Sequence, residues 1–186
     1  DYINRGPDSK GVIDFLMENS TRFHFIFLKG NHEIMMAEAK QSTENLRFWL
    51  QHGGSETLAS YNIGDNPMWY DEITHSHWRF FENTIDYYET DTYIFVHGGM
   101  KPGIVPAKQL PYDLFWKKYE TPLPYSIDKT LICGHTSRKN GKIADFGHTI
   151  CIDTFAYGGQ WLTCLNVDSK EYLQTNNKGD VQQNKL

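Results

Sequence analysis

Three short apolar runs in this chain each lead into a polar turn that contains glycine and histidine, and this repeated pattern constrains the fold most. The runs at 23–28, 93–96 and 131–133 are followed by the sequences KGNH, HGG and GH. Short apolar runs bounded by turn residues indicate strands in the interior of a sheet. Because ligands of open α/β sheets bind outside the carboxyl ends of strands, the pattern predicts an α/β domain whose functional residues lie at strand ends.

The remaining sequence predicts helices between and beside these strands. Residues Ser9–Asn19 have helical spacing, and the stretches from Ser42 to Gln51 and from Asn66 to about Phe81 form a helical insert. The run Phe23–Leu28 is apolar nearly throughout, as in a strand that is buried on both faces. Further strands are expected at 85–89, which pairs with 93–96 in a hairpin, and at 130–133, 149–152 and 161–167.

Composition bounds the class of protein. At 186 residues the chain fits one domain, which we place at residues 1–173 and follow with a polar, frayed tail at 174–186. A net charge of -5 disfavours a polynucleotide or a membrane as partner, because such binding relies on Lys and Arg. No apolar run approaches the ~20 residues of a spanning helix. Cys133, Cys151 and Cys164 lie in apolar runs without metal-binding spacing, which favours buried free thiols and a cytoplasmic location.

The polar residues at the strand ends can carry chemistry, although each also has a plainer interpretation. Asn31 can offer a carbonyl oxygen to a metal, and His32 can donate a proton near neutral pH. A helix cap beside a surface histidine is equally compatible with this pair. Asp1 can ligate a metal and Arg5 can grip phosphate oxygens. Taken alone, a turn with a surface arginine would explain these two residues as well.

His97 and His135 each end a strand beside glycine, which lets backbone or ligand approach closely. One such histidine is more often structural than a metal ligand. Two of them, together with the Asn31-His32 pair, favour a metal site. With Asp1 added, the set offers oxygen and imidazole ligands, which suit Mn, Fe or Zn.

Four motifs in order, DYINRG, GNHE, VHGG and GHT, resemble the phosphoprotein phosphatase branch of the calcineurin-like metallophosphoesterases, from Asp1 to about Val167. The stretches 49–61 and 152–159 look like its bacterial members, which include small serine/threonine protein phosphatases and symmetrical diadenosine tetraphosphate hydrolases. The resemblance implies an α/β fold, a β-sandwich flanked by helices in four α-β-β-α layers. It also implies two divalent metal ions (Mn, Fe or Zn) and a metal-bridging hydroxide that attacks phosphorus in line.

The resemblance implies a role for each matching position. Asp1 matches the carboxylate that bridges the two metals, and Asn31, His97 and His135 match the ligands of one metal. His32 matches the proton donor to the leaving group. The positions that match phosphate binders are Arg5, Asn31, Lys118 and Tyr157.

Three departures from the family pattern affect these expectations. The first family motif, Gly-Asp-x-His, is absent, so we expect that the sequence lacks the N-terminal strand of the family. We therefore expect this chain to bind at most one metal tightly and to be nearly inactive. Asn4 stands where the family has the aspartate that pairs with the donor histidine. A neutral amide orients His32 without stabilising its charged form. We therefore expect His32 to be an acid that is paired more weakly than its counterpart in the family. Lys118 replaces a second phosphate-binding arginine as a point charge, although a solvated lysine is equally compatible with it.

Three functions are compatible with this sequence. The leading hypothesis is a metal-dependent phosphomonoesterase that acts on phosphoserine or phosphothreonine in proteins. The alternative is hydrolysis of dinucleoside polyphosphates, which is the same chemistry with a nucleotide leaving group. The absence of the first motif suggests a third hypothesis, an inactive phosphate-binding or scaffold protein.

Overall fold

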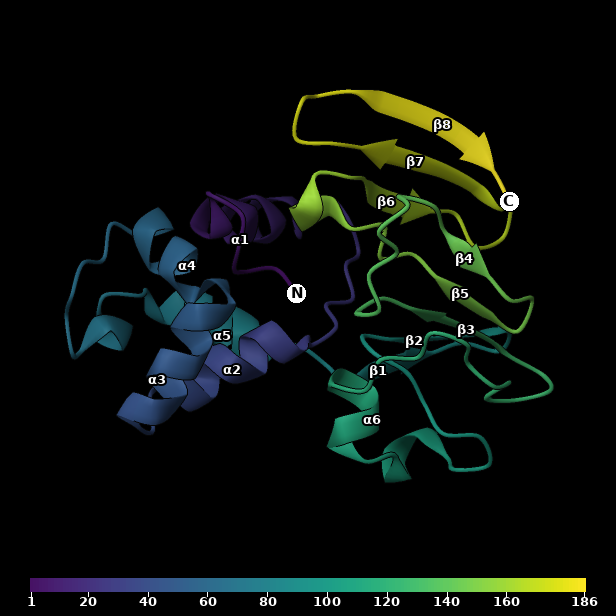
Figure 1. Cartoon of the computed structure of the whole chain (residues 1–186), viewed down its shortest axis with the longest axis horizontal. Coiled ribbons are helices and arrows are strands. Elements are labelled where there is room, and N and C mark those ends of the chain that lie inside the picture. The colour runs from purple at the N-terminus through teal and green to yellow at the C-terminus, as the bar shows by residue number, and fades with distance from the viewer. The chain divides into compact units, whose positions relative to one another are not determined.

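The computed structural model describes all residues from 1 to 186 and divides the chain into two compact units, Asp1–Asp86 and Tyr87–Leu186. Each unit is described by itself (Figure 1). The first is helical and the second carries the sheets, so the predicted mixed α/β class is confirmed. No helix in the chain is both long enough and apolar enough to cross a membrane.

The first unit is built from five α-helices and two shorter helical turns. Three of the helices have a side-chain cap at the N-terminus. The capping residues Asp8, Ser42 and Thr74 each accept a hydrogen bond from a backbone N–H of the first turn. The elements are α1 (Ser9–Asn19), α2 (Asn31–Ala39), α3 (Thr43–Trp49), a kinked turn (Leu50–Gly54), α4 (Ser55–Ser60), a 3-10 turn (Trp69–Asp71) and α5 (His75–Glu82). The helix predicted at 9–19 is thereby confirmed.

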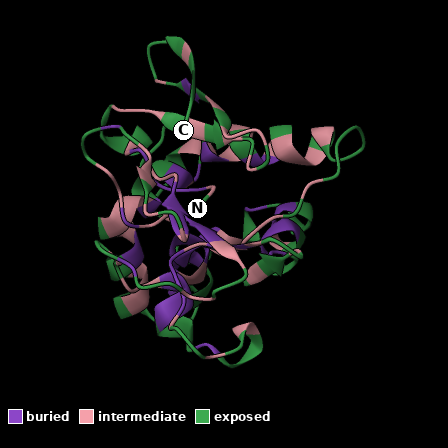
Figure 2. Cartoon of the chain, turned by 90° about the vertical axis from the view of Figure 1, so that its right-hand side faces the viewer, coloured by how far each residue is buried: buried purple, intermediate pink, exposed green.

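The core of this unit is aromatic. The rings of Trp49 and Trp69 lie 4.8 Å apart between centroids, and both side chains are almost completely buried. Ile13 of α1 and Met36 of α2 are buried with them. Figure 2 separates such buried segments, in purple, from the exposed turns and loops, in green.

The strand predicted at 23–28 is wrong. The segment is extended, but its only pairing is an isolated bridge from Leu28 to Ile85. Phe23 is 51% exposed, and its ring packs on Phe25, which in turn packs on Phe27. The apolar pattern of this segment comes from aromatic rings that pack on one another. Such a pattern does not show whether neighbouring strands are present to pair with the segment on both sides.

One predicted helix differs from the structure, and another is confirmed. The helix expected at 66–81 is split into the 3-10 turn and α5, because Thr74 caps a new start. The helix predicted from Ser42 to Gln51 is confirmed, because the backbone leaves helical geometry at His52 and Gly53. Gly53 lies in the left-handed region and closes this helix before α4 begins at Ser55.

The second unit contains a five-stranded sheet in the order β1-β2-β3-β5-β4. The pair β1–β2 is antiparallel, as the predicted hairpin requires, whereas β2–β3 and β3–β5 are parallel. Parallel pairing brings the ends of β2 and β3 to the same edge, where His97 and His135 follow. The elements are β1 (Tyr87–Glu89), β2 (Tyr93–Val96), a 3-10 turn (Pro106–Lys108), α6 (Pro111–Phe115), β3 (Thr130–Cys133), β4 (Ala144–Asp145) and β5 (Thr149–Cys151).

A second, three-stranded antiparallel sheet completes this unit. Its strands are β6 (Leu162–Leu165), β7 (Glu171–Thr175) and β8 (Val181–Lys185), and a 3-10 turn (Ala156–Gly158) precedes them. The tail expected to be frayed from residue 174 therefore forms the end of β7 and all of β8. Its polar composition reflects strands that are mostly exposed on their faces and held by backbone pairing.

The cysteine prediction is partly wrong. All three thiols are free, and Cys133 and Cys151 are buried at paired positions of β3 and β5. Cys164, however, is exposed on β6.

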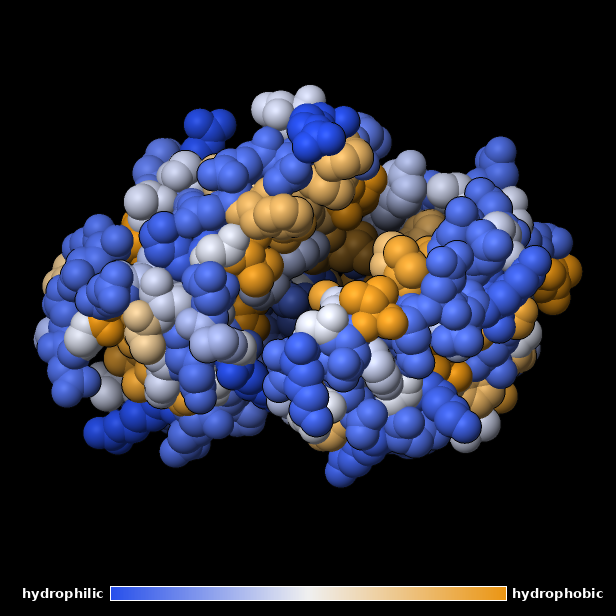
Figure 3. All heavy atoms as spheres, turned by 90° about the horizontal axis from the view of Figure 1, so that it is seen from above, coloured by the Kyte–Doolittle hydropathy of each residue, from blue (hydrophilic) through white to orange (hydrophobic).

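The face of the molecule in Figure 3 is largely hydrophilic, with exposed apolar residues among the polar ones.

Candidate functional site

The carboxylate of Asp1 lies against the beginning of α2. Its Oδ1 atom accepts a hydrogen bond from the backbone N–H of His32 at 3.3 Å, and its Oδ2 atom is 4.0 Å from His32 Nε2. Gly30 makes this approach possible, because a Cβ atom there would lie 2.0 Å from Asp1 Oδ1. An anionic group is favoured at this position, since backbone N–H groups and the helix dipole face it.

Glu33 holds this arrangement together, and the sequence analysis assigned it no role. The side chain is buried, and its two carboxylate oxygens accept hydrogen bonds from Tyr2 N at 2.7 Å and Gly30 N at 2.9 Å. These bonds tie the N-terminal turn to the turn before α2. The signal was present in the GNHE motif, because a glutamate at the third helical position commonly reaches back to the helix start.

Asn4 and Arg5 both adopt left-handed backbone conformations, with φ of 76° and 62°. Such conformations are unfavourable for residues other than glycine and persist only where surrounding contacts hold them. Here Arg5 N donates to the carbonyl of Gly53 at 3.2 Å. Gly53 itself has φ of 99°, and a Cβ atom there would lie 2.6 Å from Arg5 N. The kink after α3 therefore sets the position of the Arg5 backbone.

Hydrogen bonds fix the side chain of Asn4 on both sides. Its Oδ1 atom accepts from Trp49 Nε1 at 3.1 Å and from Thr57 Oγ1 at 2.8 Å. Its Nδ2 atom lies 2.6 Å from His32 Nδ1. All four side chains are buried. The amide thus links the candidate donor histidine to the hydrophobic core of the first unit.

The two strand-end histidines of the second unit face one another. His97 Nε2 and His135 Nδ1 are 3.2 Å apart, and the backbone N–H of Gly134 donates to the carbonyl of His97 at 2.9 Å. His135 has φ of 61°, in the left-handed region, which histidine adopts more often than most residues other than glycine. The structure thus brings the two strand-end histidines together, and their role as metal ligands stays a prediction.

A second hydrogen bond selects the tautomer of His135. Its Nε2 atom lies 2.9 Å from the carbonyl oxygen of Trp116, which can only accept. The proton therefore sits on Nε2, and the lone pair of Nδ1 is directed towards His97. Burial lowers the pKa of the His135 imidazole, and this keeps the neutral form that a metal requires.

These histidines fit the divalent cation that the resemblance implies. Two nitrogen atoms 3.2 Å apart can both bond to one ion at the usual metal–nitrogen distance of about 2.0–2.1 Å. The carbonyl partner of His135 is the kind of outer contact that orients a metal-binding imidazole. The structure gathers no group of three or more His, Cys, Asp or Glu side chains into one cluster. The histidine pair belongs to the second unit, and the Asp1 carboxylate belongs to the first.

Lys118 and Tyr157 belong to the second unit. Lys118 is exposed two residues after Trp116, and its charge acts with burial to lower the pKa of the nearby His135. Tyr157 is 53% exposed, and its ring packs edge-on against Phe155 with 4.7 Å between centroids. Their proposed contacts with phosphate stay predictions.

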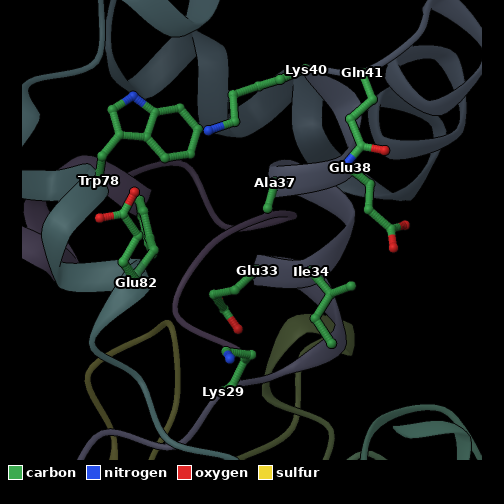
Figure 4. Close-up of a pocket in the computed structure, with 10 residues that line it drawn as sticks. Lys29, Glu33, Ile34, Ala37, Glu38, Lys40, Gln41, Trp78 and Glu82 are labelled. Carbon is green, nitrogen blue, oxygen red and sulfur yellow. The ribbon is translucent and has the colours of Figure 1, made fainter.

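A separate cavity of about 440 Å³ lies in the first unit beside α2 and α5 (Figure 4). Figure 4 shows the Lys40 side chain reaching towards the indole of Trp78, and the Lys40 Nζ atom is 4.0 Å from that ring. This cavity is lined by the part of α2 from Glu33 onwards and does not contain Asn31 or His32. It is not part of the candidate site.

Comparison with known proteins identifies the family of this chain. Residues 1–172 match a family model described as calcineurin-like phosphoesterase. A crystal structure described as that of a candidate diadenosine tetraphosphatase is similar in fold, with a TM-score of 0.59 and 13% identity over 100% of this chain and 77% of that one. A metallophosphoesterase from Sphaerobacter thermophilus gives a TM-score of 0.48 and 13% identity, covering 100% of this chain and 74% of that one. No curated protein sequence matches.

Proposed function

This chain belongs to the calcineurin-like phosphoesterase family, whose members are hydrolytic enzymes that use divalent metal ions, and we propose that it is a phosphomonoesterase acting on phosphoserine or phosphothreonine in proteins. The observation that carries the proposal is the histidine pair. Two imidazoles with nitrogens 3.2 Å apart, one of them oriented by a carbonyl, form a ready ligand pair. The motifs that surround them resemble those of the phosphoprotein phosphatase branch.

The proposed metal ligands are Asp1, Asn31, His97 and His135, and the proposed ions are two of Mn, Fe or Zn. When bound, such ions supply an activated water and neutralise the charge that develops on the phosphoryl oxygens. The ligands are oxygen and imidazole donors, which suit these metals.

The other site residues bind the phosphoryl group and move a proton. Arg5 offers a guanidinium that binds two phosphate oxygens at once, and its backbone is held by the Gly53 carbonyl. The Asn31 side chain contributes an N–H group. His32 Nε2 lies near the Asp1 carboxylate, where it can donate to the leaving oxygen. Lys118 and Tyr157 are proposed as further phosphate contacts.

Hydrolysis of dinucleoside polyphosphates is the second candidate. The observation that favours it is the fold similarity to the candidate diadenosine tetraphosphatase. Both reactions break a phosphorus–oxygen bond with the same groups, so the two candidates differ only in what surrounds the phosphate. The helical insert from Ala37 to Asn83 is the segment that we expect to set this choice.

Product analysis decides between the two candidates. The chain is incubated with Mn and, separately, a phosphoserine peptide and diadenosine tetraphosphate. We expect inorganic phosphate from the peptide at a higher kcat/KM than ADP from the dinucleotide. The reverse order would replace the first candidate by the second. If both His97→Ala and His135→Ala keep their turnover, the proposed site is wrong. His148→Ala is the matched control, because the His148 side chain contacts the Thr149 hydroxyl and the Phe146 ring and has no proposed role in the site.

A further inference from the structure

The contacts of Asn4 identify which nitrogen of His32 carries the proton. An imidazole can take either of two neutral tautomers, and the group that faces one nitrogen decides which of them forms. In the first unit the deciding group is the Asn4 side chain, 2.6 Å from His32 Nδ1. The question is therefore whether Asn4 presents its oxygen or its nitrogen.

Trp49 answers this question, because an indole N–H can only donate. Trp49 Nε1 lies 3.1 Å from one atom of the Asn4 amide, so that atom must be the oxygen. The hydroxyl of Thr57 lies 2.8 Å from the same atom and already accepts from the Asn4 backbone N–H at 2.9 Å, which leaves its own hydrogen for the amide oxygen.

The opposite orientation is unfavourable. It would place the Asn4 NH₂ group against the buried N–H of Trp49, and the indole would then lose its acceptor. A buried donor without an acceptor is unfavourable, and Trp49 is fully buried. His32 can avoid any such cost by taking the other tautomer. The core of the unit thus decides the orientation of the amide, and the amide decides the proton position.

We propose that Asn4 is a positioning residue that holds His32 as the Nε2–H tautomer, with Nδ1 accepting a hydrogen bond from the Asn4 amide. His32 then presents an N–H donor on the Asp1 side of the ring, where Nε2 lies 4.0 Å from Asp1 Oδ2. A carboxylate at position 4 would do the opposite, because it could only accept from Nδ1–H. The catalytic meaning of this arrangement rests on the proposed function, but the arrangement itself does not.

The experiment is two-bond ¹⁵N–¹H correlation NMR of the metal-free chain with a chelator present. It is recorded at about pH 9, well above the ordinary histidine pKa of about 6.5. In the wild type we expect the His32 Nε2 shift of a protonated nitrogen and the Nδ1 shift of an unprotonated one. In Asn4→Asp we expect Nδ1 to become protonated. His32→Gln assigns the signals by removing them.

His77 serves as the internal reference in every spectrum. Its Nε2 atom faces the Asp14 carboxylate at 2.9 Å and its Nδ1 atom faces the Tyr61 hydroxyl at 2.7 Å, so its own tautomer should not respond to position 4. A protonated Nδ1 in wild-type His32 would overturn the proposal, as would an unchanged His32 pattern in a folded Asn4→Asp variant. If that variant does not fold, the His77 pattern is lost and the wild-type spectrum alone decides.

These outcomes are independent of enzyme activity, because neither metal nor substrate is present. An inactive chain with the expected tautomer would contradict the proposed function alone. An active chain with a protonated Nδ1 would contradict the role of Asn4 alone.

Discussion

At the residue scale, the candidate site depends on side chains that make no proposed contact with substrate. Glu33 and Asn4 each satisfy several hydrogen bonds in buried surroundings, and each orders a neighbour that carries chemistry. Buried carboxylates and amides with few alternatives for their partners are sensitive to small changes. A substitution that keeps the shape and alters one donor or acceptor is therefore the most informative test.

Glu33→Gln is one such substitution. The backbone N–H groups of Tyr2 and Gly30 both donate to the Glu33 carboxylate. In the variant the NH₂ group of the glutamine would face one of these two N–H groups, so two donors would meet without an acceptor. We expect the free energy of unfolding to fall by roughly 1.5–3 kcal/mol, the range for hydrogen bonds to charged groups. Urea denaturation measures the change. Glu38→Gln, on the exposed side of the same helix, is the control and should change stability by less than about 0.5 kcal/mol.

At the element scale, turns between helices and strands position the functional residues. The kink at Gly53 joins α3 to α4 and also provides the carbonyl that binds Arg5 N. A glycine is needed there for two reasons, the positive φ and the short distance to the Arg5 backbone.

Gly53→Ala should consequently lower the free energy of unfolding by about 1–3 kcal/mol, since it adds backbone strain and a contact that must be relieved. It should also weaken binding of inorganic phosphate, because the Arg5 backbone has to move. Calorimetric titration and urea denaturation measure the two effects. Gly64→Ala is the matched control, because no atom lies within 4 Å of the added Cβ and its φ is not positive. Equal effects of the two alanines would contradict the role of the kink.

The C-terminal hairpin gives a second test at this scale. Strands β7 and β8 pair over five positions, from Glu171 with Lys185 to Thr175 with Val181. We expect slow hydrogen–deuterium exchange for the amides that point into this ladder, and fast exchange in the connecting turn at 177–180. Uniformly fast exchange from residue 174 onwards would support a frayed tail and contradict the pairing.

At the scale of the whole molecule, metal binding should be linked to stability. A ligand that binds only the folded chain stabilises it by roughly 2.7 kcal/mol at a free concentration of about 100 times Kd. For a chain of this size that corresponds to a rise in Tm of about 5–10 °C. We expect Mn to cause such a rise in the wild type and in His148→Ala, but not in His97→Ala. A calorimetric scan with and without Mn checks this, and an equal rise in all three would exclude His97 as a ligand.

The sequence by itself determined the family of this protein and much of its local structure. The helix at 9–19, the hairpin before His97 and the strand before His135 follow from periodicity and turn residues, which are local properties of the chain. The four ordered motifs identified the family that the comparison confirmed. The place of His97 and His135 at strand ends was predictable as well, because each follows a short apolar run beside glycine, whereas their facing depends on the parallel pairing of β2 with β3.

Only the tertiary structure decided features that depend on distant partners. The apolar segment at 23–28 lacks a ladder because strand pairing is made by other parts of the chain, and the polar segment at 181–185 becomes a strand for the same reason. The orientation of the Asn4 amide depends on Trp49, 45 residues away. A local pattern lists the donors and acceptors that a residue offers, but packing decides which of them meet, and at His32 that choice determines where the proton lies.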